Sequence, residues 1–312
     1  MKQNVLRSLE EALRPDAVIA TNTSYLDVDM LAGTMADPSR LIGLHFFAPA
    51  HIMKLLEIVK AETASTKTLA MGYAVAKRLG KIPVVAGVCD GFIGNRILAH
   101  YREASDTLLL DGCTPWDIDR AMVDFGFPMG PYEAQDLSGL DIAYANRRRL
   151  DSTRDPARRY IPISDQVVMA GRLGRKTGSG WYRYTTGGGK DIDPVIETMI
   201  LEAAASAGID RRVFTPSEIQ NRLLLAMINE AANILFEGIA ATTADIDLVL
   251  VHGFGFPRWR GGLLYYADQI GVDRLLTTLS MYAAEDLLVW RPSLVIVECA
   301  RSKISLAQWR RV

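Results

Sequence analysis

Two hydrophobic strands joined by a proline-containing turn are predicted by the segment LHFFAPAHIMKLLE, residues 44–57. His45 lies near the end of the first strand, and Glu57 lies on the second. A hairpin-like return would bring the imidazole and the carboxylate together, and such a carboxylate fixes the ring tautomer and stabilises the imidazolium. The pair has the chemistry of a general base near neutral pH. From the spacing alone, a structural salt bridge remains an equal alternative.

The chain around this segment alternates between helix and strand patterns as far as residue 86. Val5, Leu6, Leu9 and Leu13 share one face of a predicted helix that ends near Pro15. The further predicted elements are strands at residues 17–20, 41–44, 55–59 and 82–86 and a helix at residues 66–79. This alternation indicates an α/β layer in which loops at the sheet edge carry the chemistry.

Residues 92–150 and 216–312 have helical patterns and repeat one another. The landmarks of the first copy are NRIL (95–98), DG (111–112), DID (117–119), GFP (126–128) and GLD (139–141). Those of the second copy are NRLL (221–224), EG (237–238), DID (245–247), GFP (255–257) and GVD (271–273). Because the landmarks keep their order and nearly their spacing, they predict a duplicated helical domain and not a solenoid unit. The predicted domains are residues 1–88, 89–191 and 192–312.

Helix-end signals occur at the same places in both copies. Gly112 and Gly238 stand where a helix is predicted to end, and Thr114 and Thr242 are predicted to cap the helix that follows. Between the copies, the basic and aromatic run RKTGSGWY at residues 175–182 fits either a connecting loop or a contact to an anion or cofactor. Composition alone favours the loop.

Composition argues against nucleic acid or an anionic membrane as the main partner, because the net charge is −1 and the pI is about 6.4. The three cysteines are far apart, and HExxH and CxxC motifs are absent, so no metal is expected. No signal peptide or membrane span is predicted, and the final residues WRRV are not a peroxisomal tripeptide. These features predict a cytoplasmic protein.

Two further polar residues are candidates for the same sheet edge as His45. Ser24 follows the first strand, where it either caps a helix that begins near Leu26 or presents its hydroxyl to a ligand. Asn95 stands in the first turn of the long helix of the first copy. It is either an ordinary polar residue of that turn or a donor to a substrate oxygen.

Six stretches of the sequence match a known pattern. They are ATNTS (20–24), GLHFFAP (43–49), MKLLE (53–57), DGFIGNR (90–96), GFPMGP (126–131) and KTGSGWY (176–182). Together they span most of the first 185 residues, and they resemble the 3-hydroxyacyl-CoA dehydrogenase family with high specificity. The duplicated helical region is similar to the multifunctional β-oxidation enzymes, in which one chain carries two such domains.

The resemblance implies an α/β region followed by an all-α region: an incomplete Rossmann-like domain and then two tandem homologous helical domains. It also implies a reaction, the NAD-dependent oxidation of a 3-hydroxyacyl-CoA to a 3-oxoacyl-CoA in fatty-acid β-oxidation. His45 would take the proton of the 3-hydroxyl group, and Glu57 would orient His45. Ser24 and Asn95 would hold the substrate oxygens.

Contacts to NAD and to the acyl-CoA substrate are implied at further positions. Lys2, Ser24, Ala48 and Lys176 fall on cofactor-contacting positions of the family, and Tyr266 falls on a substrate-contacting tyrosine of the multifunctional enzymes. Ala48 replaces an asparagine found in many relatives, so we expect one hydrogen bond to the cofactor to be lost.

The start of the chain departs from the family pattern. The family opens with a glycine-rich turn and an acidic residue that binds the ribose, whereas this chain begins with Met1 and Lys2. We therefore expect an N-terminally truncated dehydrogenase with weakened NAD binding and little turnover. The alternative is a non-catalytic module that binds acyl-CoA or serves in assembly. An exposed sheet edge would favour oligomerisation or limited solubility. The resemblance implies a homodimer or a thiolase-type partner subunit.

Overall fold

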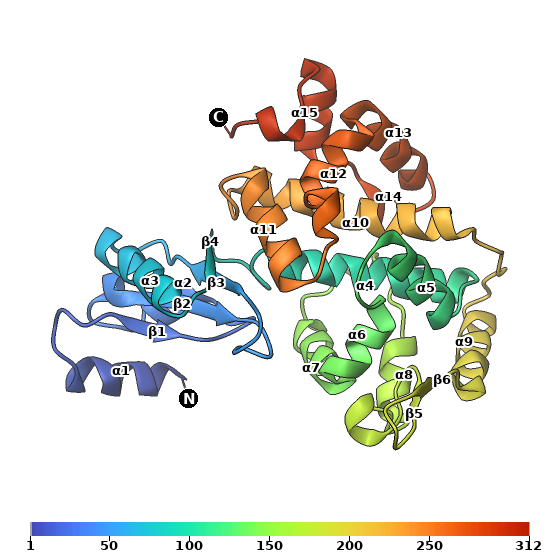
Figure 1. Cartoon of the computed structure of the whole chain (residues 1–312), viewed down its shortest axis with the longest axis horizontal. Coiled ribbons are helices and arrows are strands. Elements are labelled where there is room, and N and C mark those ends of the chain that lie inside the picture. The colour runs from blue at the N-terminus through green and yellow to red at the C-terminus, as the bar shows by residue number, and fades with distance from the viewer. Residues whose placement is uncertain (1, 312) are drawn as a thin grey trace. The chain divides into compact units, whose positions relative to one another are not determined.

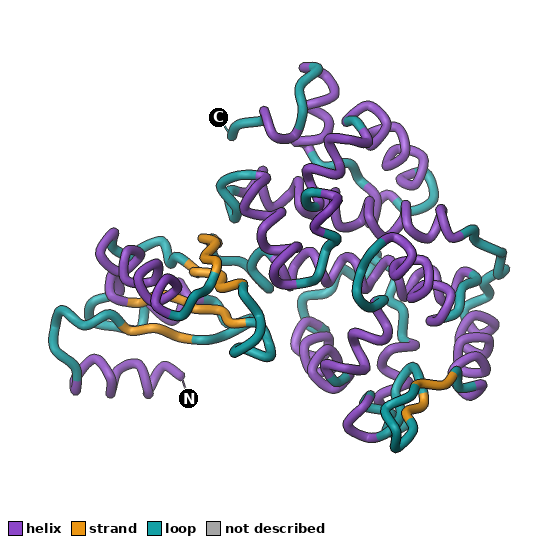
Figure 2. The backbone as a smooth tube through the Cα atoms, in the orientation of Figure 1, coloured by secondary structure: helices purple, strands orange, loops and turns teal. Residues whose placement is uncertain are grey.

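The computed structural model describes residues 2–311, which form two compact units. The first unit contains the residues up to Leu98, Met227–Glu285 and the residues from Arg291 onward. The second unit contains Ala99–Ala226 and Asp286–Trp290. Strands are confined to one sheet and one short hairpin, and helices make up most of the remaining structure (Figure 2).

A four-stranded sheet forms the centre of the N-terminal region (Figure 1). Its strands are β1 (Ile19–Thr21), β2 (Leu41–Phe46), β3 (Leu55–Val59) and β4 (Ile82–Ala86), adjacent in this order. The β1–β2 and β3–β4 pairs are parallel, whereas β2 and β3 are antiparallel. All four predicted strands are confirmed, and the antiparallel pairing of β2 with β3 confirms the predicted hairpin-like return.

Helix α3 (Thr66–Arg78) packs on one face of this sheet. It covers the even-numbered residues of the two central strands, such as Leu44 and Ile58. Because successive side chains of a strand point to opposite faces, His45 and Glu57 point to the other face. Every residue of β3 is buried, so this second face is also covered.

Helices α1 and α2 complete the N-terminal region, and the rest of the chain is mainly helical. The helices are α1 (Lys2–Ala12), α2 (Val28–Ala32), α4 (Gly94–Asp111), α5 (Pro115–Phe125), α6 (Pro131–Ser138), α7 (Leu140–Leu150), α8 (Ile163–Met169), α9 (Pro194–Ser206), α10 (Pro216–Glu237), α11 (Thr243–Gly253), α12 (Leu263–Ile270), α13 (Val272–Ala283), α14 (Leu287–Trp290) and α15 (Leu294–Ser302). Shorter elements are the 3-10 helices η1 (Pro38–Arg40), η2 (Arg175–Thr177), η3 (Arg258–Arg260) and η4 (Leu306–Gln308) and the hairpin strands β5 (Arg183–Tyr184) and β6 (Lys190–Asp191).

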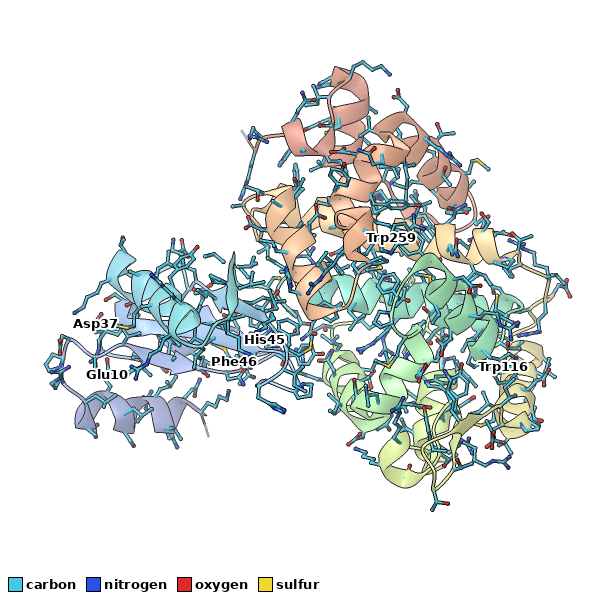
Figure 3. All side chains as sticks on the ribbon, in the orientation of Figure 1. Glu10, Asp37, His45, Phe46, Trp116 and Trp259 are labelled. Atoms are coloured by element: carbon cyan, nitrogen blue, oxygen red, sulfur yellow. The ribbon has the colours of Figure 1, made fainter. Side chains whose placement is uncertain are left out.

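Helix α1 is tied to the loop that follows α2. The carboxylate of Glu10 accepts the N–H groups of Ala36 and Asp37, each at 2.8 Å (Figure 3). Both oxygens are thus used by backbone donors, which fixes the helix against the loop that leads into β2.

The caps of the helical region follow the sequence signals. Thr114 accepts the N–H group of Asp117, and Thr242 and Asp245 form a reciprocal capping box. Asp119 accepts N–H groups from the first turn of α6 at 2.8 and 2.9 Å. Asp247 accepts N–H groups from the first turn of α12 at 2.7 and 3.2 Å.

A second pair of carboxylates also makes matching contacts. Asp136, in α6, accepts the two N–H groups of residues 181–182 at 2.9 and 3.0 Å. Asp268, at the same place in α12, accepts those of residues 306–307 at 2.7 and 3.1 Å. Composition favoured a connecting loop at residues 175–182. This segment is not a solvated loop, because Trp181 is fully buried.

None of the helices within residues 2–311 is both long enough and apolar enough to cross a lipid bilayer. In the same residues, no three His, Cys, Asp or Glu side chains gather in a way that could hold a metal ion.

Candidate active site

The register of β2 and β3 places His45 directly opposite Glu57. The imidazole Nδ1 lies 2.7 Å from the carboxylate Oε2, and the two residues are only 3 % and 0 % exposed. Figure 3 labels His45 at its place in the sheet. The contact expected from the sequence is therefore present, and both partners are buried, where a charge interaction is stronger than in water.

A backbone donor completes the surroundings of Glu57. The N–H group of Gly94, the first residue of α4, donates to Oε1 of Glu57 at 3.0 Å. Position 94 has no room for a side chain, because a Cβ atom there would lie 2.4 Å from the ring of Phe254. Glu57 is thus held between His45 and the start of α4, which orients the imidazole.

Ser24 lies on the other side of the ring. Its Oγ is 3.1 Å from Nε2 of His45. A carboxylate only accepts hydrogen bonds, so Nδ1 carries the proton toward Glu57 and Nε2 accepts the hydroxyl proton of Ser24. The lone pair of the base is therefore on Nε2, where it faces Ser24 after the end of β1. The N-cap of α2 is Asp27 and not Ser24, so the capping alternative for Ser24 is wrong.

Aromatic rings surround the imidazole. The ring centroids of Phe47 and Phe92 lie 4.6 and 5.5 Å from that of His45. Phe254, just after α11, packs edge-to-face on Phe47 with a centroid distance of 5.3 Å. These rings exclude water from the side of the base that does not face Ser24.

Two further predicted residues lie at the same edge. Lys2 donates to the carbonyl oxygen of Asn22 at 2.8 Å and to Oγ1 of Thr21 at 3.3 Å, directly after β1. Ala48 follows β2, is exposed and forms a cis peptide with Pro49. A lysine and small residues at the carboxyl ends of a parallel strand pair fit the phosphate and ribose groups of a dinucleotide.

The other predicted positions lie elsewhere or make other contacts. Asn95 is half-buried in the first turn of α4, directly after Gly94. Lys176 belongs to the second compact unit, where it pairs with Asp141. Tyr266, in α12, has its ring centroid 6.5 Å from that of Phe256.

Sequence reasoning missed the parts of the site that come from the backbone or from distant residues. Gly94 acts through its N–H group, which has no sequence signature. Phe92 and Phe254 are ordinary apolar residues in the sequence. The run DGFIGNR at residues 90–96 was the available signal for the start of α4, but its contact to Glu57 needed the structure.

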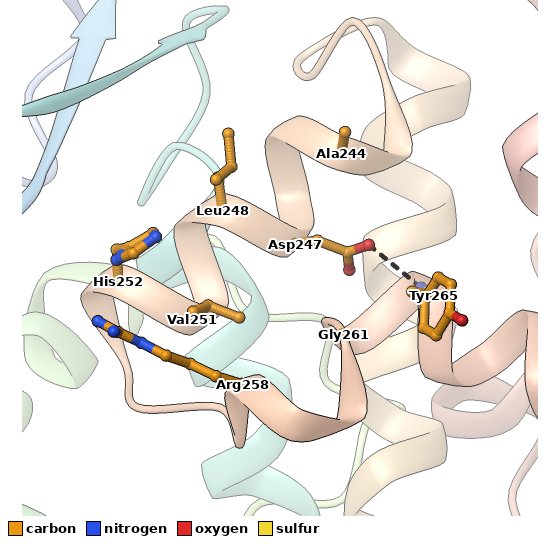
Figure 4. Close-up of a pocket in the computed structure, with 8 residues that line it drawn as sticks. All are labelled: Ala244, Asp247, Leu248, Val251, His252, Arg258, Gly261 and Tyr265. Atoms are coloured by element: carbon orange, nitrogen blue, oxygen red, sulfur yellow. Dashed lines mark hydrogen bonds between the residues drawn. The ribbon is translucent and has the colours of Figure 1, made fainter.

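A separate pocket of about 410 Å³ lies between α11 and α12 (Figure 4). Burial raises the pKa of Asp247 to about 6, although its two backbone N–H bonds oppose this. Burial and the nearby charge of Arg258 lower the pKa of His252. Tyr265 also lines this pocket, and its N–H bond to Asp247 is drawn in Figure 4.

Comparisons with known proteins show the family to which the chain belongs. The model of the 3-hydroxyacyl-CoA dehydrogenase NAD-binding domain matches residues 1–89, and that of the C-terminal domain matches residues 91–184 and 219–300. The fold is thus a Rossmann-like NAD-binding domain followed by a helical C-terminal region, which confirms the predicted order of an α/β region and an all-α region. Since the C-terminal model covers more than half of the chain, the chain belongs to the 3-hydroxyacyl-CoA dehydrogenase family.

Individual relatives and solved structures support the family. A peroxisomal bifunctional enzyme of Danio rerio is 40 % identical over 99 % of this chain and 45 % of its own length. The dehydrogenase part of multifunctional enzyme 1 of C. elegans has a TM-score of 0.67 and 26 % identity, covering 95 % of this chain and 68 % of that one. The fold is also that of 3-hydroxybutyryl-CoA dehydrogenase of Escherichia coli, with a TM-score of 0.79, 24 % identity and coverage of 96 % and 79 %. The chain spans less than half the length of the curated relatives it matches.

These findings correct one expectation and give no support to another. The prediction of a cytoplasmic protein is contradicted, because the matched relatives of Danio rerio and Homo sapiens are named peroxisomal enzymes. Cysteine spacing and terminal residues do not determine location, since targeting signals are addresses read by receptors. The expected truncation of the NAD-binding domain receives no support, because its family model matches residues 1–89.

Proposed function

We propose that this chain oxidises the 3-hydroxyl group of a 3-hydroxyacyl-CoA to a ketone, with His45 as general base. The observation that carries the proposal is the hydrogen-bonded series from Ser24 through His45 to Glu57, with distances of 3.1 and 2.7 Å. Nε2 of His45 accepts the hydroxyl proton of the substrate in the place where it accepts that of Ser24. Glu57 stabilises the imidazolium that results.

We propose that Ser24 and Asn95 hold the substrate oxygens and that Tyr266 contacts the acyl-CoA. Ser24 is hydrogen-bonded to the base, and Asn95 follows the glycine that binds Glu57. Donors fixed in this way stabilise charge that develops on the oxygen atom during the reaction. Proton transfer and substrate orientation are then both functions of the same edge of the sheet.

NAD is the proposed cofactor, and it supplies the acceptor for the hydride that leaves C3. Lys2, Ser24, Ala48 and Lys176 are its proposed contacts. We also propose that NAD binds weakly, because the sequence has no strand–Gly-x-Gly-x-x-Gly–helix unit to receive the pyrophosphate. Titration of the chain with NADH, followed by calorimetry, measures this affinity. A dissociation constant in the low micromolar range or below would contradict weak binding.

We propose that the chain consists of domains at residues 1–88, 89–191 and 192–312 and that the last two are tandem homologous copies. Support comes from the matching contacts of Asp119 and Asp247 and from the two separate matches to one C-terminal-domain model. A homodimer or a complex with a thiolase-type subunit is the proposed assembly. Light scattering that shows only a monomer at high concentration would contradict self-association.

Acetoacetyl-CoA reduction with loss of NADH absorbance tests the proposed activity in the reverse direction. His45→Gln should lower kcat by about 100-fold or more, because the base is lost. The matched control is His51→Gln, which alters an exposed histidine in the turn between β2 and β3. Unchanged turnover in His45→Gln would contradict the proposed mechanism. Binding of the CoA ester with no turnover in the unsubstituted chain would instead favour the non-catalytic acyl-CoA-binding or assembly module.

A further inference from the structure

We propose that Arg96 is a positioning residue for the His45–Glu57 pair and that it acts by fixing the first turn of α4 to α10. The inference rests on the proposed role of His45 as base. Arg96 lies two residues after Gly94, whose N–H group binds Glu57. A residue that fixes this turn therefore fixes one of the two hydrogen bonds of Glu57.

The guanidinium of Arg96 binds two carboxylates of α10. Nε donates to Glu230 at 2.5 Å, and the two terminal nitrogens donate to the two oxygens of Glu237 at 2.5 and 2.7 Å. The other oxygen of Glu230 accepts the amide of Asn233 at 3.0 Å. The planar fork of arginine suits this geometry, whereas a lysine ammonium cannot bind both carboxylates in the same way.

The contact between Arg96 and Glu230 lies in a protected position. The side chains of Arg96 and Glu230 are 19 % and 5 % exposed, so water screens their attraction only weakly. The partners are separated by 134 and 141 positions in the sequence, so they join the start of the first helical segment to the second. Loss of the guanidinium would leave a buried carboxylate without its main partner, which is costly.

The backbone of the turn before α4 is tightly constrained, so a displacement of Arg96 also displaces the neighbouring residues of the turn. Gly91 has φ +79° and Phe92 has φ +52°, which is rare for a residue with a side chain. A Cβ atom at Gly91 would lie 2.9 Å from the backbone nitrogen of Arg96. Because the turn is this tight, displacement of Arg96 moves Gly94 and the ring of Phe92 together.

Displacement of Gly94 changes the chemistry of the base through Glu57. The N–H group of Gly94 stabilises the negative charge of Glu57 and fixes one of its two oxygens. Loss of this bond would let the carboxylate turn away from Nδ1 of His45, so the imidazole would no longer be held in the orientation of a base. The nearby thiol of Cys89 also faces Glu57 and Arg96, but burial raises its pKa, so it stays neutral.

Two charge-conserving substitutions test the proposal in the full chain: Arg96→Lys and Glu237→Asp. We expect the amide proton of Gly94 to move upfield in NMR spectra and to exchange about tenfold faster, since its hydrogen bond is weakened. We expect kcat to fall about 10- to 100-fold with little change in KM, because small displacements of catalytic groups are costly.

Lys303→Met is the matched control, since it removes an exposed ion pair with Asp273 in the same compact unit. It should leave the chemical shift of the Gly94 amide, its exchange rate and kcat unchanged. Glu237 has a 44 % exposed side chain, so Glu237→Asp remains informative if Arg96→Lys fails to fold. An unchanged Gly94 amide in the folded variants would overturn the positioning role. The amide measurement needs no turnover, so it stays decisive even if His45→Gln shows that the proposed activity is wrong.

Discussion

Asp119 and Asp247 cap corresponding helices, but Asp119 also accepts a tyrosine hydroxyl group, that of Tyr182, at 2.8 Å. Ala307 corresponds to Tyr182, because its N–H group binds Asp268 as that of Tyr182 binds Asp136. The side chain of Ala307 is a methyl group and offers no hydroxyl. Asp119 and Asp247 therefore accept N–H groups from corresponding helix starts, and Asp119 has the hydroxyl of Tyr182 as an additional partner.

Tyr182→Phe should destabilise the chain by about 1–3 kcal/mol, because a hydrogen bond between a buried hydroxyl and a carboxylate is lost. The pKa of Asp119, which burial raises to about 6, should rise further because Tyr182 now lowers it. Urea unfolding and carbon NMR titration measure these two effects. Tyr265→Phe is the control, since this exposed ring belongs to the first turn of the helix that Asp247 caps. Equal stability of Tyr182→Phe and the parent would refute the prediction.

Asp247 should make the stability of the fold depend on pH. Burial raises its folded-state pKa to about 6, above the ordinary value of 3.8. Between about pH 4 and pH 6 the folded chain therefore holds a proton that the unfolded chain has released, and the free energy of unfolding falls as pH rises through this window. Asp247 contributes up to about 3 kcal/mol to this fall. Asp247→Asn should flatten the profile of unfolding midpoint against pH, and an unchanged slope would contradict the assignment.

Glu57→Gln should lower kcat by about 10³- to 10⁴-fold while the chain stays folded. An amide offers one donor and one acceptor group. Since Gly94 donates to one oxygen of Glu57, the amide would keep its oxygen there and turn its NH₂ group toward His45. The ring would then carry its proton on Nε2, the wrong nitrogen for a base. Steady-state kinetics measure the effect, with the exposed Glu62→Gln as control. Retention of more than a tenth of kcat would contradict the tautomer argument.

Gly94→Ala should destabilise the fold by about 1–3 kcal/mol, because the new methyl group would lie 2.4 Å from the ring of Phe254. Phe254→Leu in the same chain should restore part of the loss, since it opens space beside position 94. Gly187→Ala is the control, because a Cβ atom there meets nothing within 4 Å. Thermal unfolding of the parent, of Gly94→Ala, of Phe254→Leu and of the double variant forms a double-mutant cycle. Strict additivity would show that the methyl group and the ring do not interact.

The N-terminal sheet and the His45–Glu57 contact could be predicted because both depend on local patterns. Apolar runs determine the strands, and the short turn between β2 and β3 determines their register, so two polar residues 12 positions apart meet. Contacts of Arg96 and Phe254 could not be predicted in this way. They join residues more than 100 positions apart, and nothing in the local sequence specifies their partners.

The helical landmarks were predictable for a similar reason. Caps such as Thr242 with Asp245 are local hydrogen bonds between residues three positions apart. The role of the segment at residues 175–182 could not be predicted, because its composition is mainly polar. Its function in the fold comes from the burial of Trp181 and from the backbone hydrogen bonds to Asp136.

The packing of Phe254 on Phe47 has a consequence for biosynthesis. The first compact unit needs residues from both ends of the chain, so a ribosome must synthesise most of the protein before this unit can close. Until α10 and α11 emerge, the apolar face that bears His45 lacks its covering and is open to chaperones or to aggregation. A nascent chain arrested before residue 227 should therefore be protease-sensitive in its N-terminal sheet, whereas one that includes residue 285 should be resistant.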